Sequence, residues 1–321
     1  FFEGVEPDPS VETVMRGAKA MQEFEPDWIV AIGGGSPIDA AKAMWAFYEH
    51  PDTTLEDLIV PFNFPKLRTK AHFCAIPTTS GTATEVTAFS VITDYSKGIK
   101  YPLADFEITP DVAILDPLLV ASLPAKQVAY TGMDALTHAI EGYITKGHCT
   151  ISDMFHLEAI KLISQSLRGA VQNTPEGREG MALGQYIAGM GFSNVGLGIV
   201  HSMAHGLSAL YDTPHGVACA IILPTGLEYN KTVAGERYRA VGKAMGVKGI
   251  DEMNDVEAAD ATIAAVKQLS ADVGIPANLQ GILKEEDIHF LAESAFADAC
   301  RPGNPRDTSV EEIVELYKSQ L

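Results

Sequence analysis

The feature that most constrains the fold is a short apolar run that leads directly into a glycine turn. Residues 28–32 are apolar throughout, which is typical of a strand buried on both faces of a sheet. Gly33-Gly34-Gly35 follows, and Ser36-Pro37 then has the residue types of a helix N-cap and of a first helical position. The sequence therefore predicts a strand, a glycine turn and a helix, the unit from which parallel α/β sheets are built.

Strand-like and helix-like patterns alternate over residues 1–120. Ser10 can cap a helix whose apolar residues recur at helical spacing and which ends before Pro26. Further strands are predicted at 73–76, 86–92 and 112–115. This alternation indicates an α/β domain over 1–120 with a mostly parallel sheet.

Long amphipathic patterns replace this alternation over residues 121–321. They predict helices at 127–145, 152–167, 177–190, 256–273 and 310–320. We therefore expect a second, all-helical domain over 121–321.

Composition excludes several classes of protein. With 321 residues, 46% of them hydrophobic, the chain can bury a large core. Its 42 acidic and 23 basic residues give a net charge of -19, which repels phosphate backbones and argues against nucleic acid as a partner. The apolar windows are far shorter than the roughly 20 residues that cross a bilayer, so no membrane span is expected. The four cysteines, Cys74, Cys149, Cys219 and Cys300, lie far apart, which indicates free thiols and a cytoplasmic protein.

Two loops are candidates for binding a phosphate-containing ligand. The glycine turn places backbone N–H groups at the start of a helix, where they can hold a pyrophosphate, although a plain strand-to-helix turn explains it equally well. The second loop, residues 78–85, gathers hydroxyl groups around Gly81 after a strand. Ligands of open α/β sheets bind at such strand ends, so two loops are stronger evidence than one.

A cluster of possible metal ligands lies in the helical half. Asp134 and His138 are four residues apart and share one helix face; His201 and His205 repeat that spacing, and His215 follows. Such a set suits a divalent first-row metal such as Fe, Zn, Co or Ni. Taken singly, each histidine is more often a buried core residue whose ring nitrogens are hydrogen-bonded. Asp134 could equally cap a helix or pair with a lysine. Five such residues in two tight clusters favour a metal site.

The chain resembles the iron-containing (group III) alcohol dehydrogenases. The resemblance is carried by Gly33-Gly-Gly-Ser-Pro-Ile-Asp39, Pro77-Thr-Thr-Ser-Gly-Thr82, Asp111-Val-Ala-Ile-Leu-Asp-Pro117, Gly132-Met-Asp-Ala-Leu-Thr-His-Ala-Ile-Glu141, His201-Ser-Met-Ala-His205, Pro214-His-Gly216 and Gly303-Asn-Pro-Arg306. It implies an α/β dinucleotide-binding domain, an all-helical C-terminal domain, and a cleft between them that holds NAD or NADP and one divalent metal, Fe²⁺ or a substitute such as Zn²⁺.

The resemblance also implies the roles of individual residues. The metal ligands would be Asp134, His138, His201 and His215, with His205 beside the nicotinamide and substrate as the catalytic proton relay. Spacing alone would pair His201 with His205. The cofactor would lie against Gly33, Gly34, Gly35, Ser36 and Asp39, and against Thr78, Thr79, Thr82 and Lys100.

Two features depart from the family pattern. Ala83 stands where the family commonly has glycine, which narrows the freedom of the backbone beside the cofactor. Relatives also carry about one more strand-helix-strand unit before the position of Phe1, so we expect a natural product longer by roughly 30 to 60 residues. A sheet without that unit exposes an unpaired apolar edge, which favours association or instability. We also expect a homo-oligomer.

The activity that this resemblance implies is interconversion of small primary alcohols or diols and their aldehydes. One alternative is a metal- and NAD-dependent cyclase of the dehydroquinate synthase type, but residues 127–211 contain few basic side chains for a phosphorylated substrate. Others are a zinc-containing polyol dehydrogenase and a non-catalytic, truncated paralogue. The complete ligand set argues against the paralogue.

Overall fold

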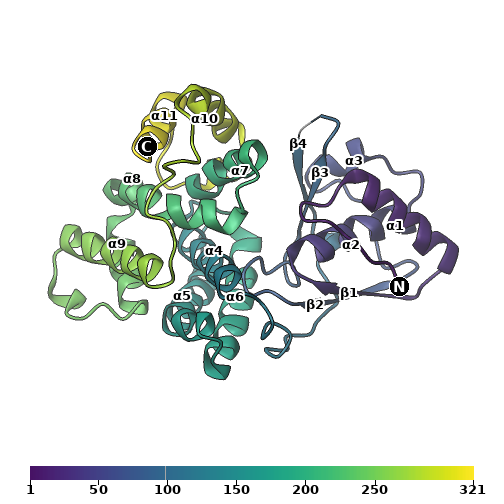
Figure 1. Ribbon diagram of the computed structural model, residues 1–321, viewed down its shortest axis with the longest axis horizontal. Helices are drawn as coiled ribbons and strands as arrows, with labels where there is room; N and C mark the ends of the chain where they lie inside the picture. Colours follow the sequence, from purple (N-terminus) through teal and green to yellow (C-terminus); the bar gives the residue numbers. More distant parts are fainter. Residues whose placement is uncertain (98) are drawn as a thin grey trace. The chain divides into compact units, whose positions relative to one another are not determined.

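The computed structural model describes residues 1–97 and 99–321, which form two compact units, Phe1–Val120 and Ala121–Leu321. The first unit is α/β and the second is helical, which confirms the predicted fold class (Figure 1). Each unit has its own hydrophobic core.

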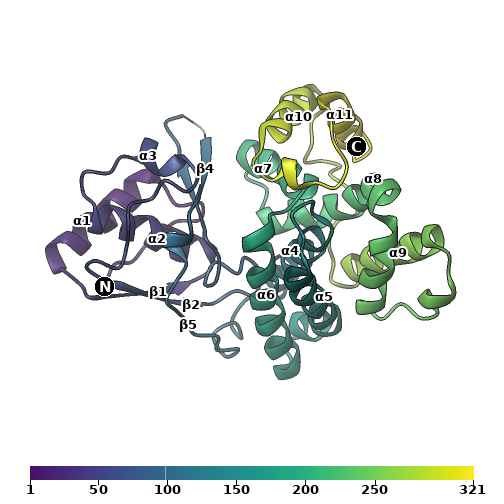
Figure 2. The same cartoon turned by 180° about the vertical axis from the view of Figure 1, so that it is seen from behind.

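The first unit contains two small sheets with different topologies. Its elements are α1 (Val11–Phe24), β1 (Trp28–Gly33), α2 (Gly35–Glu49), α3 (Leu55–Ile59), β2 (His72–Pro77), β3 (Phe89–Asp94), β4 (Ile99–Ala104) and β5 (Val112–Ala113). Strands β1, β2 and β5 form a parallel sheet in the order β1-β2-β5, seen from behind in Figure 2. Strand β3 pairs antiparallel with β4. The predicted strand at 86–92 therefore belongs to a separate two-stranded sheet, which corrects the single, mostly parallel sheet expected from the sequence.

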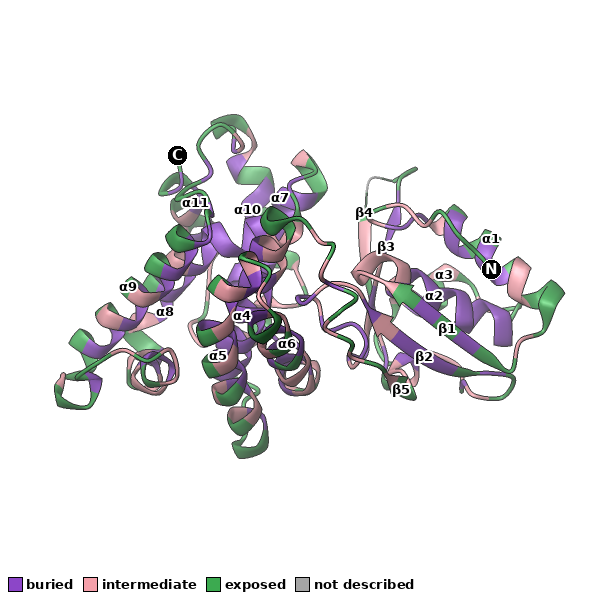
Figure 3. Cartoon of the chain, turned by 60° about the horizontal axis from the view of Figure 1, so that its bottom comes forward, coloured by how far each residue is buried: buried purple, intermediate pink, exposed green. Residues whose placement is uncertain are grey.

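The prediction that the first strand is buried on both faces is wrong. Ile29 and Ala31 are buried, whereas Trp28, Val30 and Ile32 are 47%, 56% and 58% exposed. Buried and exposed stretches alternate along β1 in Figure 3. Helix α2 packs on β1, and α1 packs on α2. Among the described residues, the other face of β1 stays uncovered.

The second unit is built around helix α4. Its helices are α4 (Ala125–Ile144), α5 (Thr150–Val171), α6 (Pro175–Val195), α7 (Ile199–Tyr211), α8 (His215–Ala244), α9 (Asp255–Asp272), α10 (Ile288–Ala297) and α11 (Val310–Lys318). All five predicted helices are present. Helices α5, α6 and α8 surround α4, so every residue from 132 to 144 is buried. Within the described part of the chain, no helix is both long enough and apolar enough to span a bilayer. All four cysteines are free thiols.

A histidine lies in the middle of this helical core. His156 of α5 is fully buried, and its ring packs against Gly142 of α4 and Gly191 of α6. A Cβ atom at either glycine would lie 2.3 Å from His156 Nε2, so only glycine leaves room for the ring. Neither ring nitrogen has a hydrogen-bond partner among the described residues. Burial lowers the pKa of His156 to about 4, which keeps the imidazole neutral at pH 7.

Candidate functional site

Three helices bring the predicted metal ligands of the second unit together. Asp134 lies on α4, His201 is the third residue of α7, and His215 is the first residue of α8. Asp134 Oδ1 lies 3.8 Å from His201 Nε2 and 3.6 Å from His215 Nε2. Ligands about 2.1 Å from a tetrahedral ion are about 3.4 Å apart, so this spacing suits one metal ion.

The polar atoms at the centre of this cluster lack ordinary partners. Asp134 Oδ1 and His201 Nε2 are buried, and neither has a hydrogen-bond partner among the residues that the structure describes. Leaving two such atoms unsatisfied in the core costs free energy, which a bound cation would recover. The donor set, one carboxylate and imidazole nitrogens, therefore fits a divalent metal.

Electrostatics of the site follow from its burial. Burial raises the pKa of Asp134, while His138 and the thiol of Cys219 act in the opposite direction. Burial lowers the pKa of His201 to about 3. His201 is therefore neutral at pH 7, and neutral imidazole is the form that binds metals.

His138 lies beside the cluster, in ring contact with one of its members. Its ring stacks on Phe192, with centroids 4.3 Å apart, and on His201, with centroids 4.6 Å apart. The tight group of possible ligand atoms, all within 4.8 Å of one another, consists of Asp134, His201, His215 and Cys219. Sequence reasoning missed Cys219, although it follows His215 by four residues on the same helix face.

Cys219 lies beside His215 within this group of possible ligand atoms. Its Sγ lies 3.5 Å from His215 Nε2, and the residue is fully buried. Burial raises the pKa of the Cys219 thiol well above its ordinary value, which favours the protonated sulfur in the absence of a metal. A bound metal ion would favour loss of that proton.

His205 lies one turn after His201 and has a partner of its own. Its Nδ1 lies 2.8 Å from Asp298 Oδ2, and its ring stacks on His215 with centroids 5.2 Å apart. Burial acts to raise the pKa of Asp298, but His205 and Cys300 outweigh it and hold that pKa at about 2. The Asp298 carboxylate is thus ionised and orients the His205 ring. Because Asp298 is 93 residues away in sequence, no local pattern signals this contact.

In the first unit, the glycine turn and the second loop pack against each other. Helix α2 begins at Gly35 with Gly34 as its N-cap, so the prediction that Ser36 caps the helix is wrong. Ser36 Oγ instead accepts a hydrogen bond from the N–H of Asp8 at 3.2 Å. A Cβ at Gly34 would lie 3.2 Å from Thr79 Cγ2, and one at Gly35 would lie 2.9 Å from Thr82 Cγ2. Thr78 joins them through its N–H, which donates to Gly33 O at 2.8 Å. Since no side chain caps α2, its first N–H groups can receive an anion.

Asp39 and Lys42 of α2 form a buried polar support behind this turn. The Asp39 carboxylate accepts from the Thr84 hydroxyl and from the N–H of Val91. Lys42 Nζ donates to two backbone carbonyls, Thr87 O at 2.7 Å and Phe89 O at 2.9 Å. Burial lowers the pKa of Lys42 to about 8. These contacts tie α2 to the second loop and to the start of β3. No local sequence pattern signals the role of Lys42.

Two further residues predicted near the cofactor have defined positions. Lys100 Nζ forms an ion pair with Asp8 Oδ2 at 2.8 Å, and Asp8 is also the residue whose N–H donates to Ser36 Oγ. Ala83 is buried and has φ +54°, in the left-handed region that favours glycine. The backbone thus keeps the conformation that glycine would adopt there, with a methyl group added.

Two family models match the chain and together cover most of it. The model for iron-containing alcohol dehydrogenase matches residues 1–117, and the model for the C-terminal part of the Fe-containing alcohol dehydrogenase family matches residues 128–321. The chain belongs to the iron-containing alcohol dehydrogenase family. This confirms the resemblance found in the sequence and the expected enzyme class, an alcohol dehydrogenase, over the cyclase alternative.

Individual relatives agree with this placement. The chain is 50% identical to an NADPH-dependent butanol dehydrogenase of Clostridium saccharobutylicum, over 99% of this chain and 82% of the relative. It is 47% identical to a lactaldehyde reductase of Escherichia coli, over 98% of this chain and 82% of the relative. The structure of a 1,3-propanediol oxidoreductase superposes with a TM-score of 0.95 at 38% identity, covering 100% of this chain and 84% of that one.

Proposed function

We propose that this alcohol dehydrogenase interconverts small primary alcohols or diols and the corresponding aldehydes, with Fe²⁺ at its metal site and NAD or NADP as hydride carrier. Zn²⁺ or another divalent ion suits the same ligands. The observation that carries the proposal is the buried Asp134 Oδ1, which lacks a hydrogen-bond partner among the described residues and faces His201 and His215. Relatives named for butanol, lactaldehyde and 1,3-propanediol support the substrate class.

In this proposal the second unit supplies the metal site. Asp134, His138, His201 and His215 hold the ion, and Cys219 lies beside them. A bound divalent metal acts as a Lewis acid that lowers the pKa of an alcohol and polarises a carbonyl. Burial of Asp134 and His201 keeps water away from these ligands.

His205 moves the proton in this scheme. Its side chain is 36% exposed, whereas those of Asp134 and His201 are nearly inaccessible, so it can pass a proton between substrate and solvent. Imidazole is suited to this role because it titrates near neutral pH. The Asp298 carboxylate fixes the orientation of the ring through Nδ1.

The first unit binds the cofactor in this proposal. Backbone N–H groups of Gly33, Gly34 and Gly35, with the Ser36 hydroxyl, receive the pyrophosphate, and hydride transfer is the chemistry of the nicotinamide itself. The cofactor lies further along Thr78, Thr79, Thr82 and Lys100. Because both oxygens of Asp39 already accept hydrogen bonds within the unit, Asp39 supports the shape of the turn.

The setting of the enzyme is part of the same proposal. Four free thiols favour the cytoplasm, and the net charge of -19 disfavours nucleic acid as a partner. The exposed apolar residues of β1 favour a homo-oligomer.

A panel of small alcohols and diols, assayed with NAD⁺ and NADP⁺ on protein of known metal content, tests this function. We expect turnover that EDTA abolishes and that Fe²⁺ or Zn²⁺ restores. The variant His205→Ala serves as the matched control, since it should keep the metal and turn over slowly. Metal-loaded protein without activity on any alcohol would favour the non-catalytic alternative.

A further inference from the structure

The start of helix α7 is buried, and side chains from distant parts of the chain cap it. The first N–H groups of a helix have no partner within the helix, and Gly198, the N-cap, has no side chain to offer. Glu141 of α4 accepts from the N–H of Val200 at 2.7 Å and from the N–H of His201 at 3.2 Å. Asn304 Oδ1 accepts from the N–H of Ile199 at 3.2 Å. The helix that carries the ligand His201 is thus held at its first turn.

Glu141 also contacts the imidazole ring of His201. Glu141 Oε2 lies 2.6 Å from His201 Nδ1, and both side chains are only 2% exposed. Burial raises the pKa of Glu141 to about 7, while the backbone N–H groups of Val200 and His201 and the positive end of the α7 dipole favour the carboxylate. Oε2, the oxygen beside the ring, already accepts from the N–H of His201. It therefore acts as an acceptor, which places the hydrogen of the ring contact on Nδ1.

The opposite ring nitrogen is the one that faces the metal cluster. With hydrogen on Nδ1, a neutral imidazole carries its lone pair on Nε2. His201 Nε2 lies 3.8 Å from Asp134 Oδ1 and has no hydrogen-bond partner among the described residues. A lone pair there is what a metal ligand needs.

We propose that Glu141 is the positioning residue of His201: its carboxylate selects the tautomer with Nδ1–H and an Nε2 lone pair, and it anchors the first turn of α7. This inference rests on the proposed metal site. It gives Glu141 a role in metal affinity although Glu141 itself touches no metal.

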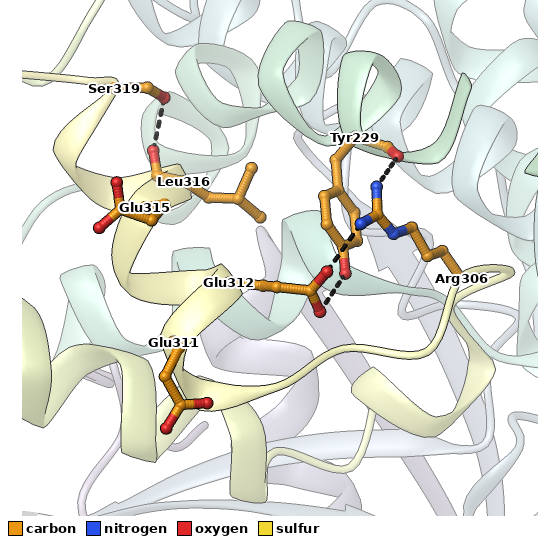
Figure 4. Close-up of a pocket in the computed structure, with 7 residues that line it drawn as sticks. All are labelled: Tyr229, Arg306, Glu311, Glu312, Glu315, Leu316 and Ser319. Carbon is orange, nitrogen blue, oxygen red and sulfur yellow. Dashed lines mark hydrogen bonds and ion pairs between the residues drawn. The ribbon is translucent and has the colours of Figure 1, made fainter. Parts of the chain in front are cut away.

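The segment that carries Asn304 is itself rigidly anchored. Asn304 exchanges amide hydrogen bonds with Asn230 of α8, at 2.8 Å in both directions. Two residues later, the guanidinium of Arg306 lies 4.0 Å from the ring centre of Tyr229 and donates to Glu312 of α11 at 2.7 Å. These residues line a shallow hollow of about 370 Å³ (Figure 4). Asn304 therefore provides a second fixed cap for α7 that does not contact the ring of His201.

The variant Glu141→Gln tests the effect on the His201 tautomer while changing the shape of the site little. The amide keeps the size of the side chain but replaces one acceptor oxygen with an NH₂ donor. If the NH₂ takes the place of Oε2, it donates to Nδ1 and favours the Nε2–H tautomer, in which Nε2 has no lone pair for a metal; the N–H of His201 then loses its acceptor. If the NH₂ takes the place of Oε1, the N–H of Val200 loses its acceptor instead, and that is the shorter of the two contacts, at 2.7 Å against 3.2 Å. We therefore expect the first orientation. Asn304→Ala is the matched control, because it also removes a cap of α7 but leaves the His201 ring contact in place.

The first readout is the tautomer of His201 in metal-free protein, from long-range ¹H–¹⁵N correlation spectra of histidine-labelled samples. We expect Nδ1–H in the wild type and in Asn304→Ala, and Nε2–H in Glu141→Gln. The second readout is Zn²⁺ affinity by competition with a chelator. Glu141→Gln should weaken Zn²⁺ binding by about 10- to 100-fold, and Asn304→Ala should change it by less than about threefold even if its Tm falls.

Several results would overturn the inference. One is a Glu141→Gln variant that keeps the Nδ1–H tautomer of His201 or the Zn²⁺ affinity of the wild type. Another is an Asn304→Ala variant whose Zn²⁺ affinity falls as much as that of Glu141→Gln. Should Glu141→Gln fail to fold, Glu141→Asp retains a carboxylate and should keep Nδ1–H on His201; Nε2–H in that variant contradicts the role of Glu141. Failure of the wild type to bind any divalent metal would instead refute the proposed function, and the tautomer comparison would still test Glu141.

Discussion

The buried histidine His156 makes the stability of the helical unit depend on pH. Its pKa is about 4 in the folded protein, against an ordinary value of 6.5 that applies when the chain unfolds. Below pH 6.5 the unfolded chain therefore binds a proton that the folded protein excludes. The contribution of the neutral His156 to the free energy of unfolding is fully present above pH 6.5 and is lost as the pH falls towards 4.

The size of this effect follows from the two pKa values. Their difference corresponds to roughly 3 kcal/mol of unfolding free energy in total, of which about 2 kcal/mol is lost between pH 7 and pH 5. Burial is the dominant cause; Asp153 nearby favours the proton and Arg237 opposes it. Because the ring nitrogens make no hydrogen bond to the described residues, His156→Phe removes the titration and keeps a flat ring.

Urea unfolding of EDTA-treated protein at pH 7, 6 and 5 measures this dependence. Far-UV circular dichroism follows mainly the helices of the second unit, whereas both tryptophans, Trp28 and Trp45, report on the first unit and provide an internal control. We expect the wild type to lose about 2 kcal/mol more than His156→Phe between pH 7 and pH 5. Parallel pH profiles for the two proteins would refute the argument.

Three further substitutions test other parts of the account. Gly34→Val places a side chain against Thr79 Cγ2, 3.2 Å from the position of its Cβ, and should weaken NAD(P) binding by about 10-fold or more in calorimetry while metal content stays unchanged. Cys219→Ala should retain bound metal in elemental analysis, and loss of the metal would make Cys219 a ligand. Gly198→Ala puts a Cβ 2.8 Å from Glu141 Oε1, so it should destabilise the helical unit by about 1–3 kcal/mol in urea unfolding and weaken Zn²⁺ binding.

The sequence predicted elements well where the local pattern decides the structure. The helix at 127–145 and the strands at 28–32 and 73–76 have strong periodicity or a continuous apolar run, and all three are present. Strand β4 was missed because Pro102 within it lowers the expectation of a strand, although proline is tolerated in a strand at a sheet edge. The exposed face of β1 depends on what packs over it, which an apolar run cannot reveal.

In the candidate site too, local spacing predicted some residues, whereas contacts between distant segments could not be predicted. Helical spacing indicated that Asp134 and His138 share a face, and the same rule applied to His215 would have indicated Cys219. Contacts between distant segments had no such signal. Glu141 and His201 are 60 residues apart, and His205 and Asp298 are 93 apart, so only the folded chain brings these pairs together.

Metal stoichiometry across single-ligand variants tests the central claim most directly. Elemental analysis of the purified wild type should give one divalent ion per chain, and the alanine variants of Asp134, His138, His201 and His215 should each lose most of it, because three ligands hold the ion far less tightly than four. His205→Ala should keep one ion per chain. A wild type that binds no metal, or an ion lost from His205→Ala and retained in His215→Ala, would contradict the account.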